Sequence, residues 1–379
     1  MEMYWDDEEE PCVVLDNGSH RIKAGIAGDD SPRSIFRTVV GTPLYEGQTI
    51  GGKPQKKYFV GDQVIENIDV LDIRRPIERG IVTDWDAMER VWHHVFDELR
   101  TVPSDMSVLV TETPMNPKSQ REKIAQIMFE KIQPRGMYVV SPNVLSLYSS
   151  GRGSGLVIDS GYEVTDVVCI FEGHKVRQSM FRADIGGNDI THYLIELLGK
   201  RGYAFTTAKE VEEVSVMKEK YAYVSNNPQT ENVDNIRQEY TFSNGTTICL
   251  DYERFQCMEA MFKPHLIGSD ACGIHELIVK SIKACPVDVR NDIYCSFILS
   301  GGNTMTEGLV SRLEQELRAL LPLNRRIKVI APPERRISTW VGGSIWGSLS
   351  SSQQLWMTPV EYDEFGPSIV YRSKFTQHW

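Results

Sequence analysis

Three short runs of consecutive apolar residues occur along the chain, and each is followed directly by a turn of small and polar residues. A short apolar run bounded by turn residues is typical of a strand that is buried on both faces. The runs and their turns are residues 12–15 and 16–19, 156–158 and 159–161, and 297–299 and 300–304. The pattern predicts three buried strands that each end in a turn containing glycine.

Two of these turns begin with aspartate, Asp16 and Asp159, and they lie about one domain length apart. A motif repeated at that distance indicates two related structural halves. We therefore expect two α/β halves that face each other and each contribute a turn to a shared site.

Helical patterns lie between the predicted strands. Apolar residues recur at helical spacing in residues 85–99, and further helices are predicted at 117–130, 144–148 and 309–320. Alternation of strands and helices favours a largely parallel α/β core. Two polar segments look inserted: residues 41–57 are expected to form a mobile loop in a small lobe, and residues 225–238 an exposed loop in a helical lobe.

Composition narrows the class of protein. The 379 residues carry 41 basic and 52 acidic side chains, a net charge of −11, which disfavours non-specific binding to nucleic acid. The seven cysteines form no CxxC pair, so neither a disulfide framework nor a zinc site is expected. The chain lacks an apolar run long enough to span a membrane and a secretory start, so we expect an intracellular protein without a membrane anchor.

The turns offer the chemistry of a phosphate site. Gly18 lets backbone N–H groups approach an anion closely, and Ser19 adds a hydroxyl donor. Asp16 and Asp159 are suited to holding Mg²⁺ or Ca²⁺ through water, and Lys23 to reaching a phosphate. Two facing aspartate turns and a Ser-Gly-Gly turn for the sugar and base would together form an ATP clamp.

This order of motifs resembles the actin, Hsp70 and hexokinase superfold, and the surrounding sequence is much closer to actin. The similarity is collinear over essentially the whole chain and is strongest in residues 14–19, 23–30, 84–86, 121–123, 145–148, 331–335 and 361–364. It implies an α/β two-lobed fold with duplicated βαβ domains and a nucleotide cleft between them. The implied parts are a first large subdomain of residues 1–37, 76–149 and 338–379, a small inserted subdomain of residues 38–75, a second large subdomain of residues 150–185 and 270–337, and an inserted helical subdomain of residues 186–269.

The resemblance also assigns roles to individual residues, with ATP or ADP and Mg²⁺ or Ca²⁺ as the implied ligands. Phosphate contacts are implied for Asn17, Gly18, Ser19, His20, Lys23, Ser160, Gly161, Tyr162 and Glu163. Nucleoside contacts are implied for Gly187, Lys218, Glu219, Gly301, Gly302, Met305 and Arg336. The implied metal ligands, through water, are Asp16 and Asp159.

The residues that actin uses for hydrolysis are the ones that differ. Actin has a glutamine that orients the attacking water and a histidine that assists it, and Pro142 and Asp166 stand at these positions. Proline has no polar side-chain atom, and Asp166 adds negative charge. Asn143 replaces the glutamine only if the turn shifts by one residue. Because phosphoryl transfer to water needs a positioned nucleophile, we expect ATP binding with slow or absent hydrolysis, at most a weak ATPase.

Two changes beside the expected phosphates leave alternatives open. His20, at a glycine position of actin, either crowds the phosphates or, when protonated, helps to hold them. Glu163 repels a phosphate unless its side chain points outward or meets the metal.

The favoured function is a nucleotide-bound structural subunit of a cytoskeletal or multiprotein assembly, in which ATP staples the lobes. One alternative is a conventional filament-forming actin with a working ATPase, and another is a small-molecule kinase of the same superfold. Expected partners are other actin-family subunits or a larger complex, in the cytoplasm and cytoskeleton, with the nucleus and the cilium left open. Candidate docking points are a cleft at Trp346, which either fills the cleft or anchors a partner on its floor, the acidic residues 6–10, and Trp379.

Overall fold

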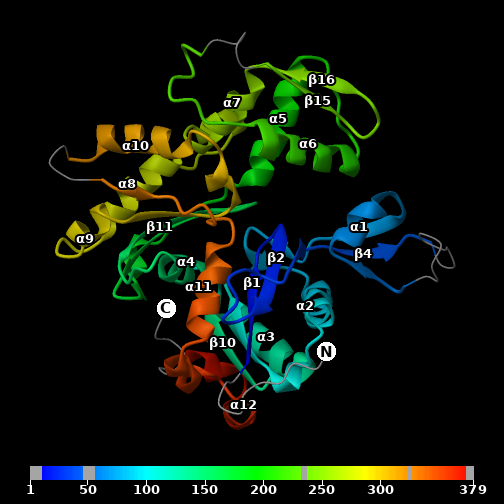
Figure 1. Ribbon diagram of the computed structural model, residues 1–379, viewed down its shortest axis with the longest axis vertical. Helices are drawn as coiled ribbons and strands as arrows, with labels where there is room; N and C mark the ends of the chain where they lie inside the picture. The colour runs from blue at the N-terminus through cyan, green and yellow to red at the C-terminus, as the bar shows by residue number, and fades with distance from the viewer. Residues whose placement is uncertain (1–10, 46–55, 232–236, 323–326, 373–379) are drawn as a thin grey trace. The chain divides into compact units, whose positions relative to one another are not determined.

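The computed structural model describes residues 11–45, 56–231, 237–322 and 327–372. The chain divides into two compact units (Figure 1). Unit 1 comprises residues 1–154, 170–175 and 337–379, and unit 2 comprises residues 155–169 and 176–336. The four-part division expected from the resemblance is finer than this and stays a prediction.

Unit 1 combines a five-stranded mixed sheet and two smaller sheets, β5-β4-β6 and β7-β8, with helices, and it includes β13, which pairs with β12. Its strands are β1 (Cys12–Asn17), β2 (Arg21–Ile26), β3 (Ser34–Arg37), β4 (Val40–Pro43), β5 (Phe59–Val60), β6 (Leu71–Arg74), β7 (Ile77–Glu78), β8 (Ile81–Val82), β9 (Ser107–Thr111), β10 (Gly136–Val140) and β13 (His174–Lys175). Its helices are α1 (Asp62–Glu66), α2 (Trp85–Leu99), α3 (Lys118–Ile127), α4 (Pro142–Ser149), α11 (Ser338–Gly347) and α12 (Pro359–Phe365).

Unit 2 has the same kind of sheet and a helix-rich insertion. Its strands are β11 (Gly155–Ser160), β12 (Thr165–Phe171, whose last residues belong to unit 1), β14 (Phe181–Ala183), β15 (Gln238–Thr241), β16 (Thr247–Leu250), β17 (Phe297–Ser300) and β18 (Val329–Ile330). Its helices are α5 (Gly187–Lys200), α6 (Ala208–Tyr221), α7 (Glu253–Gln256), α8 (Ile274–Ala284), α9 (Arg290–Tyr294) and α10 (Leu309–Leu320).

The two main sheets share one strand order, which supports the expected duplication. In one sheet the order is β10-β9-β1-β2-β3, and in the other it is β18-β17-β11-β12-β13, with β14 also pairing β12. β10, β9 and β1 are parallel, as are β18, β17 and β11, whereas β2, β3 and β14 pair antiparallel to their neighbours. Each sheet is therefore mixed rather than largely parallel.

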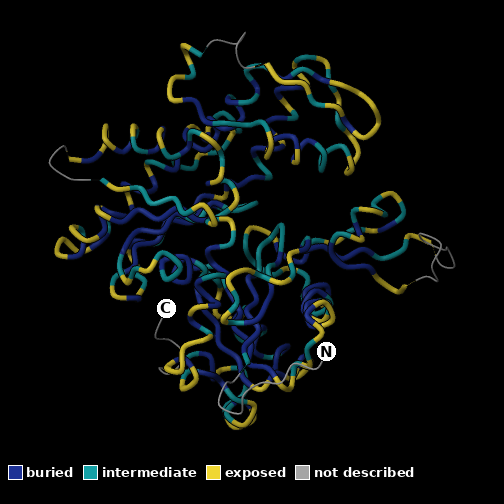
Figure 2. Tube along the Cα trace, viewed as in Figure 1, coloured by how far each residue is buried: buried dark blue, intermediate teal, exposed yellow. Residues whose placement is uncertain are grey.

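The buried cores follow the predicted strands. Val13, Val14 and Leu15 of β1 are fully buried, as are the apolar residues of β11 and β17. Figure 2 shows the central strands of each unit as buried tube with exposed residues at the connecting turns. The side chains of Trp92 from α2 and Trp340 from α11 complete the core of unit 1.

Local sequence sets the helix limits. The prediction of residues 85–99 is confirmed as α2, which begins where the Asp84 carboxylate accepts a hydrogen bond from Ala87 N (2.9 Å) and ends at Arg100, with φ of 54°. The prediction of 309–320 is confirmed as α10. The prediction of a helix at 117–130 is partly wrong. The α-helix α3 ends at Ile127, and a π-helical turn continues to Ile132.

Parts of the two segments expected to be inserted loops belong to strands. Residues 41–43 belong to β4, which pairs with β6, and residues 46–55 lie outside the described residues. Residues 232–236 also lie outside them, but Ser225 is buried rather than exposed, and β15 and β16 form a hairpin in the lobe expected to be helical. In the described part of the chain, no helix is long and apolar enough to cross a membrane.

Candidate functional site

In unit 1, the first aspartate turn is a hairpin closed by an ion pair. Asp16 and Lys23 are cross-strand neighbours on β1 and β2, and Lys23 Nζ donates to Asp16 Oδ2 at 2.6 Å. Both side chains are largely buried. The lysine expected to reach a phosphate is therefore held by the aspartate expected to hold a metal through water.

The next residues of this turn are tied to the sheet. Asn17 N donates to Thr111 Oγ1 (2.8 Å), and the Asn17 side chain donates to Thr111 O and accepts from Trp92 Nε1. A side chain on Gly18 would meet Arg21 O at 2.4 Å, so the turn requires glycine. The Ser19 hydroxyl has no hydrogen-bond partner within the described residues. This hydroxyl can donate to an anion.

Pro142 and Asn143 stand at the start of α4, which follows the carboxyl end of β10. Pro142 is the first residue of the helix, after Ser141. Asn143 has 0% exposure, and its Nδ2 atom has no hydrogen-bond partner within the described residues. The amide of Asn143 is sealed inside unit 1, which disfavours the one-residue shift that would let it replace a water-orienting glutamine.

In unit 2, the second aspartate turn is a two-residue hairpin packed on α5. Gly161 N donates to Val164 O (2.9 Å), so Tyr162 and Glu163 form the tip. The carbonyl oxygens of Gly161 and Tyr162 accept from Gly187 N (3.0 Å) and Asn188 N (2.7 Å). The first two N–H groups of α5 therefore donate to carbonyl oxygens of the protein itself.

The carboxylate of Asp166 is paired with an arginine, so the expectation that it adds negative charge to the site is wrong. Its two carboxylate oxygens accept from Arg182 Nε (2.8 Å) and Nη2 (2.9 Å), a bidentate pair between β12 and β14. Burial acts to lower the pKa of Arg182, but the hydrogen bond and charge of Asp166, with the charges of Asp184 and Asp159, raise it. Asp166 is thus committed to Arg182 and offers no free group for orienting water.

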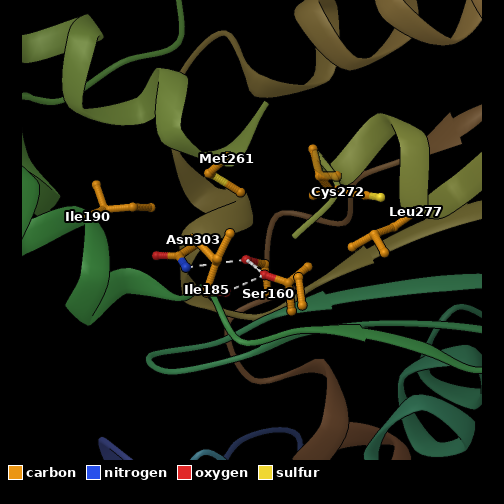
Figure 3. A pocket seen from close by; sticks show the side chains of 10 residues that line it. Ser160, Ile185, Ile190, Met261, Cys272, Leu277 and Asn303 are labelled. Carbon is orange, nitrogen blue, oxygen red and sulfur yellow. Dashed lines mark hydrogen bonds between the residues drawn. The ribbon is translucent and has the colours of Figure 1, made fainter. Parts of the chain in front are cut away.

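Asn303, in the 3₁₀ turn Gly302–Met305, joins the turn expected to bind the nucleoside to the second aspartate turn. Its Nδ2 atom donates to Ser160 Oγ (3.2 Å) and to Gly161 O (2.7 Å), and Figure 3 shows the Asn303 side chain turned toward Ser160. Behind them lies a small cavity of about 10 Å³, lined by apolar side chains such as Ile185, Ile190 and Met261. The cavity has room for about one water molecule, too little for a nucleotide.

Lys218, from α6, is a buried cation. Its side chain donates to Gly187 O and to Thr191 Oγ1 (2.8 Å), and the residue is only 7% exposed. Within the described residues no carboxylate lies at ion-pair distance from its ammonium. Burial lowers the pKa of Lys218 to about 8.

The charge of Lys218 should make stability depend on pH. Because its pKa is about 8 in the folded chain and about 10.4 when unfolded, folding releases its proton between these values. Below pH 8 the folded chain bears the full cost of burying the charged ammonium. This cost falls as the pH rises toward 10.4. We expect the stability of the wild type relative to Lys218→Met to rise by up to about 3 kcal/mol over this window, measured by urea unfolding. The exposed neighbour Lys220→Met is the control, and a pH-independent difference for Lys218→Met would contradict the assignment.

The remaining expected nucleoside residues lie in unit 2 around the same turn. Gly301 has φ of +88°, and a side chain there would meet Ser160 O at 2.3 Å, which joins this glycine to the phosphate turn. No described atom lies within 4 Å of a side chain built on Gly302, and Met305 is exposed. Glu219 and Arg336 form a surface ion pair at 2.6 Å, so Glu219 points away from its buried neighbour Lys218.

Of the three expected docking points, the structure describes Trp346. It is 5% exposed, stacks on Tyr138 with ring centres 4.6 Å apart, and meets Trp356 edge-on. This packing favours the interpretation that Trp346 fills its cleft. Residues 6–10 and Trp379 lie outside the described residues.

The structure thus gathers the expected residues into one cluster per unit and adds partners that sequence reasoning missed. The missed residues are Trp92, Thr111, Thr165, Arg182 and Asn303. Only Asn303 carried a local signal, since it lies inside the Ser-Gly-Gly turn. Thr165 is close in sequence to its partner Ser160. Strand register brings Thr111 and Arg182 to their partners, and the packing of helix α2 brings Trp92 to Asn17.

Comparison with known families agrees with this arrangement. Residues 7–375, nearly the whole chain, match the family profile described as Actin. The match covers both aspartate turns, the Ser-Gly-Gly turn and the inserted segments. Together with two sheets of the same strand order, each bearing an aspartate at the end of a central strand, it establishes that the chain belongs to the actin family.

Proposed function

We propose that this chain is an actin-like, cytoskeletal or complex-forming subunit that binds ATP or ADP with Mg²⁺ or Ca²⁺ and hydrolyses the nucleotide slowly or not at all. The nucleotide then serves to hold the two lobes together. Binding to the folded state alone stabilises it by mass action, without hydrolysis. The favoured compartments are the cytoplasm and the cytoskeleton.

The residues present fit a nucleotide with a divalent cation. The buried ammonium of Lys218 has only neutral partners, and such a cation is stabilised by an anionic ligand. Ser19 offers a hydroxyl donor, and space around Gly302 is open to a ligand. Asp16 and Asp159 are oxygen donors of the kind that Mg²⁺ and Ca²⁺ take. A bound cation would neutralise phosphate charge.

One observation carries the proposal of slow hydrolysis: neither position that should hold the attacking water has a group for it. Pro142, the first residue of α4, has no polar side-chain atom, and the carboxylate of Asp166 is bonded to Arg182. Asn143 is sealed inside the unit. Without an oriented nucleophile, phosphate release lacks the positioning on which phosphoryl transfer depends.

The test is single-turnover phosphate release from the full chain loaded with ATP and Mg²⁺. We expect ATP to remain bound and little phosphate to appear. Pro142→Gln combined with Asp166→His should raise the rate by about 100-fold, because it restores both water-positioning groups. Pro142→Ala is the matched control, since it relaxes the backbone without adding a polar atom.

The outcomes separate the alternatives. Release by the wild type as fast as by the double variant would favour a conventional actin ATPase, especially with salt-dependent pelleting of filaments. Transfer of the γ-phosphate to a small molecule would favour the kinase. A wild type that retains neither ATP nor ADP would overturn nucleotide binding itself.

A further inference from the structure

A thiol and an ammonium group meet at the surface of unit 2. Lys280 lies in α8, and Cys272 lies two residues before that helix begins. Lys280 Nζ donates to Cys272 Sγ at 2.7 Å. Such a distance is ordinary for a hydrogen bond between nitrogen and oxygen but short for one to the larger sulfur atom. It is close to the separation of two atoms that are bonded to one shared oxygen.

The carboxylate nearest to Lys280 along the helix is used elsewhere. Glu276, one turn earlier on α8, accepts from Gly273 N at 3.0 Å and caps the helix. Within the described residues, no carboxylate lies at ion-pair distance from the ammonium of Lys280. The pKa of Lys280 is raised, first by its hydrogen bond to Cys272 and then by the charge of Cys272. The thiol is therefore the group that holds this ammonium.

Solvent reaches both members of the pair. Lys280 is exposed and Cys272 is half-buried, and Cys272 also lines the small cavity beside Ser160 (Figure 3). A nearby cation favours the thiolate, which is the form of cysteine that reacts with oxidants. Cys249 is the contrast within unit 2: this half-buried thiol lies 3.8 Å from a carboxylate oxygen of Asp251, and burial and the charge of Asp251 raise its pKa.

We propose that Cys272 and Lys280 form a modification site at which hydrogen peroxide joins the sulfur to the nitrogen through a single oxygen atom. In the first step the sulfur attacks a peroxide oxygen and the O–O bond breaks. The sulfur is oxidised by two electrons to a sulfenic acid, and the other oxygen leaves as water with the thiol proton.

The second step oxidises the nitrogen. The sulfenic acid is neutral, so the charge that held the proton on Lys280 is gone, and the ammonium releases a proton to water more readily. A second peroxide oxidises the amine by two electrons to a hydroxylamine and is reduced to water. The hydroxylamine oxygen then bonds to the sulfur, whose hydroxyl group leaves as a third water. Excess thiol supplies the four electrons that return the thiol and the amine, with release of one water.

The test is mass spectrometry of the full chain, first reduced and then treated with hydrogen peroxide. Cleavage after glutamate places Cys272 in residues 260–276 and Lys280 in residues 277–307, so a bridge between them joins the two peptides. We expect the joined pair to weigh one oxygen more and two hydrogens less than the sum of the free peptides. Dithiothreitol should separate the pair again.

Two variants divide the role of Lys280. Lys280→Gln should abolish the joined pair and slow the oxidation of Cys272 about tenfold, because the cation beside the thiol is lost. Lys280→Arg keeps the charge, but its guanidinium is not deprotonated, so Cys272 should oxidise quickly without a joined pair. The matched control is Lys283→Gln, which removes another exposed lysine of α8 and should behave as the wild type.

Wild-type Cys272 that stays reduced, or that gains oxygen without joining Lys280, would overturn the proposal. So would a joined pair that has lost two hydrogens and gained no oxygen, since sulfur and nitrogen would then be bonded directly. Oxidation of Cys249 as fast as that of Cys272 would show that the contact with Lys280 does not direct the reaction. These results do not depend on nucleotide binding, so this proposal and the proposed function can fail independently.

Discussion

Gly342→Ala is expected to destabilise the chain by about 3 kcal/mol, because α11 has no room for a methyl group where it crosses α4. A side-chain carbon on Gly342 would lie 1.8 Å from the backbone oxygen of Leu145. The helices also share a buried hydroxyl contact, Ser146 Oγ to Thr339 Oγ1 at 3.0 Å. Since the obstacle is backbone, one helix must move away and loosen the core behind β1.

The measurement is urea unfolding followed by circular dichroism, with Gly199→Ala as the control. Gly199 is also helical, in α5, but nothing lies within 4 Å of a side chain built there. Alanine has the higher helix propensity, so this substitution should stabilise by up to about 1 kcal/mol. The two substitutions are therefore expected to differ in sign, and a Gly342→Ala variant as stable as the wild type would refute the packing argument.

Arg312→Leu is expected to cost about 3 kcal/mol, because it removes the buried partner of the Glu259 carboxylate in unit 2 and leaves it only the half-exposed Lys263, at 3.4 Å. Arg312 donates to Glu259 Oε1 (2.8 Å) and to the carbonyl of Ser225 (2.6 Å), and its side chain is 5% exposed. Glu259 is buried as well. Leucine fills part of the volume but satisfies neither acceptor.

Arg318→Leu, on the same helix α10, is the matched control. Arg318 pairs with Glu314 at the same 2.8 Å, but its side chain is 65% exposed, so its loss should cost less than about 1 kcal/mol. Combining Arg312→Leu with Glu259→Leu should recover much of the lost stability, since it also removes the buried carboxylate that has lost its buried partner. Equal costs for Arg312→Leu and Arg318→Leu in urea unfolding would show that burial does not set the energy of this pair.

The candidate site was partly predictable because its residue types lie in local motifs. The glycines of the turns and the aspartates at the ends of β1 and β11 are visible in a few consecutive residues. What those residues bond to was not visible. The Asp16–Lys23 pair, the Asn17 contacts with Thr111 and Trp92, and the occupied first turn of α5 depend on strand register and on segments far apart in sequence.

The reversal at Asp166 illustrates the same limit. From its side chain alone, an aspartate in place of histidine predicts added negative charge at the site. The partner Arg182 lies 16 residues away on a short strand, and nothing in the local sequence shows that the two strands pair at that register. Tertiary structure thus changed the role of this residue from a repulsive charge to half of a buried ion pair.

By itself, the sequence determined the helices at 85–99 and 309–320, the three buried strands with their glycine turns, and the duplicated α/β character of the chain. These features follow from side-chain periodicity, caps and turn residues, which act over a few positions. Only the tertiary structure decided that Ser225 is buried under Arg312, that Asn143 is sealed from solvent and that Trp346 is stacked on Tyr138. These features depend on contacts between segments that are far apart in the chain. The residues next to a polar loop residue do not show which distant segment will bury it.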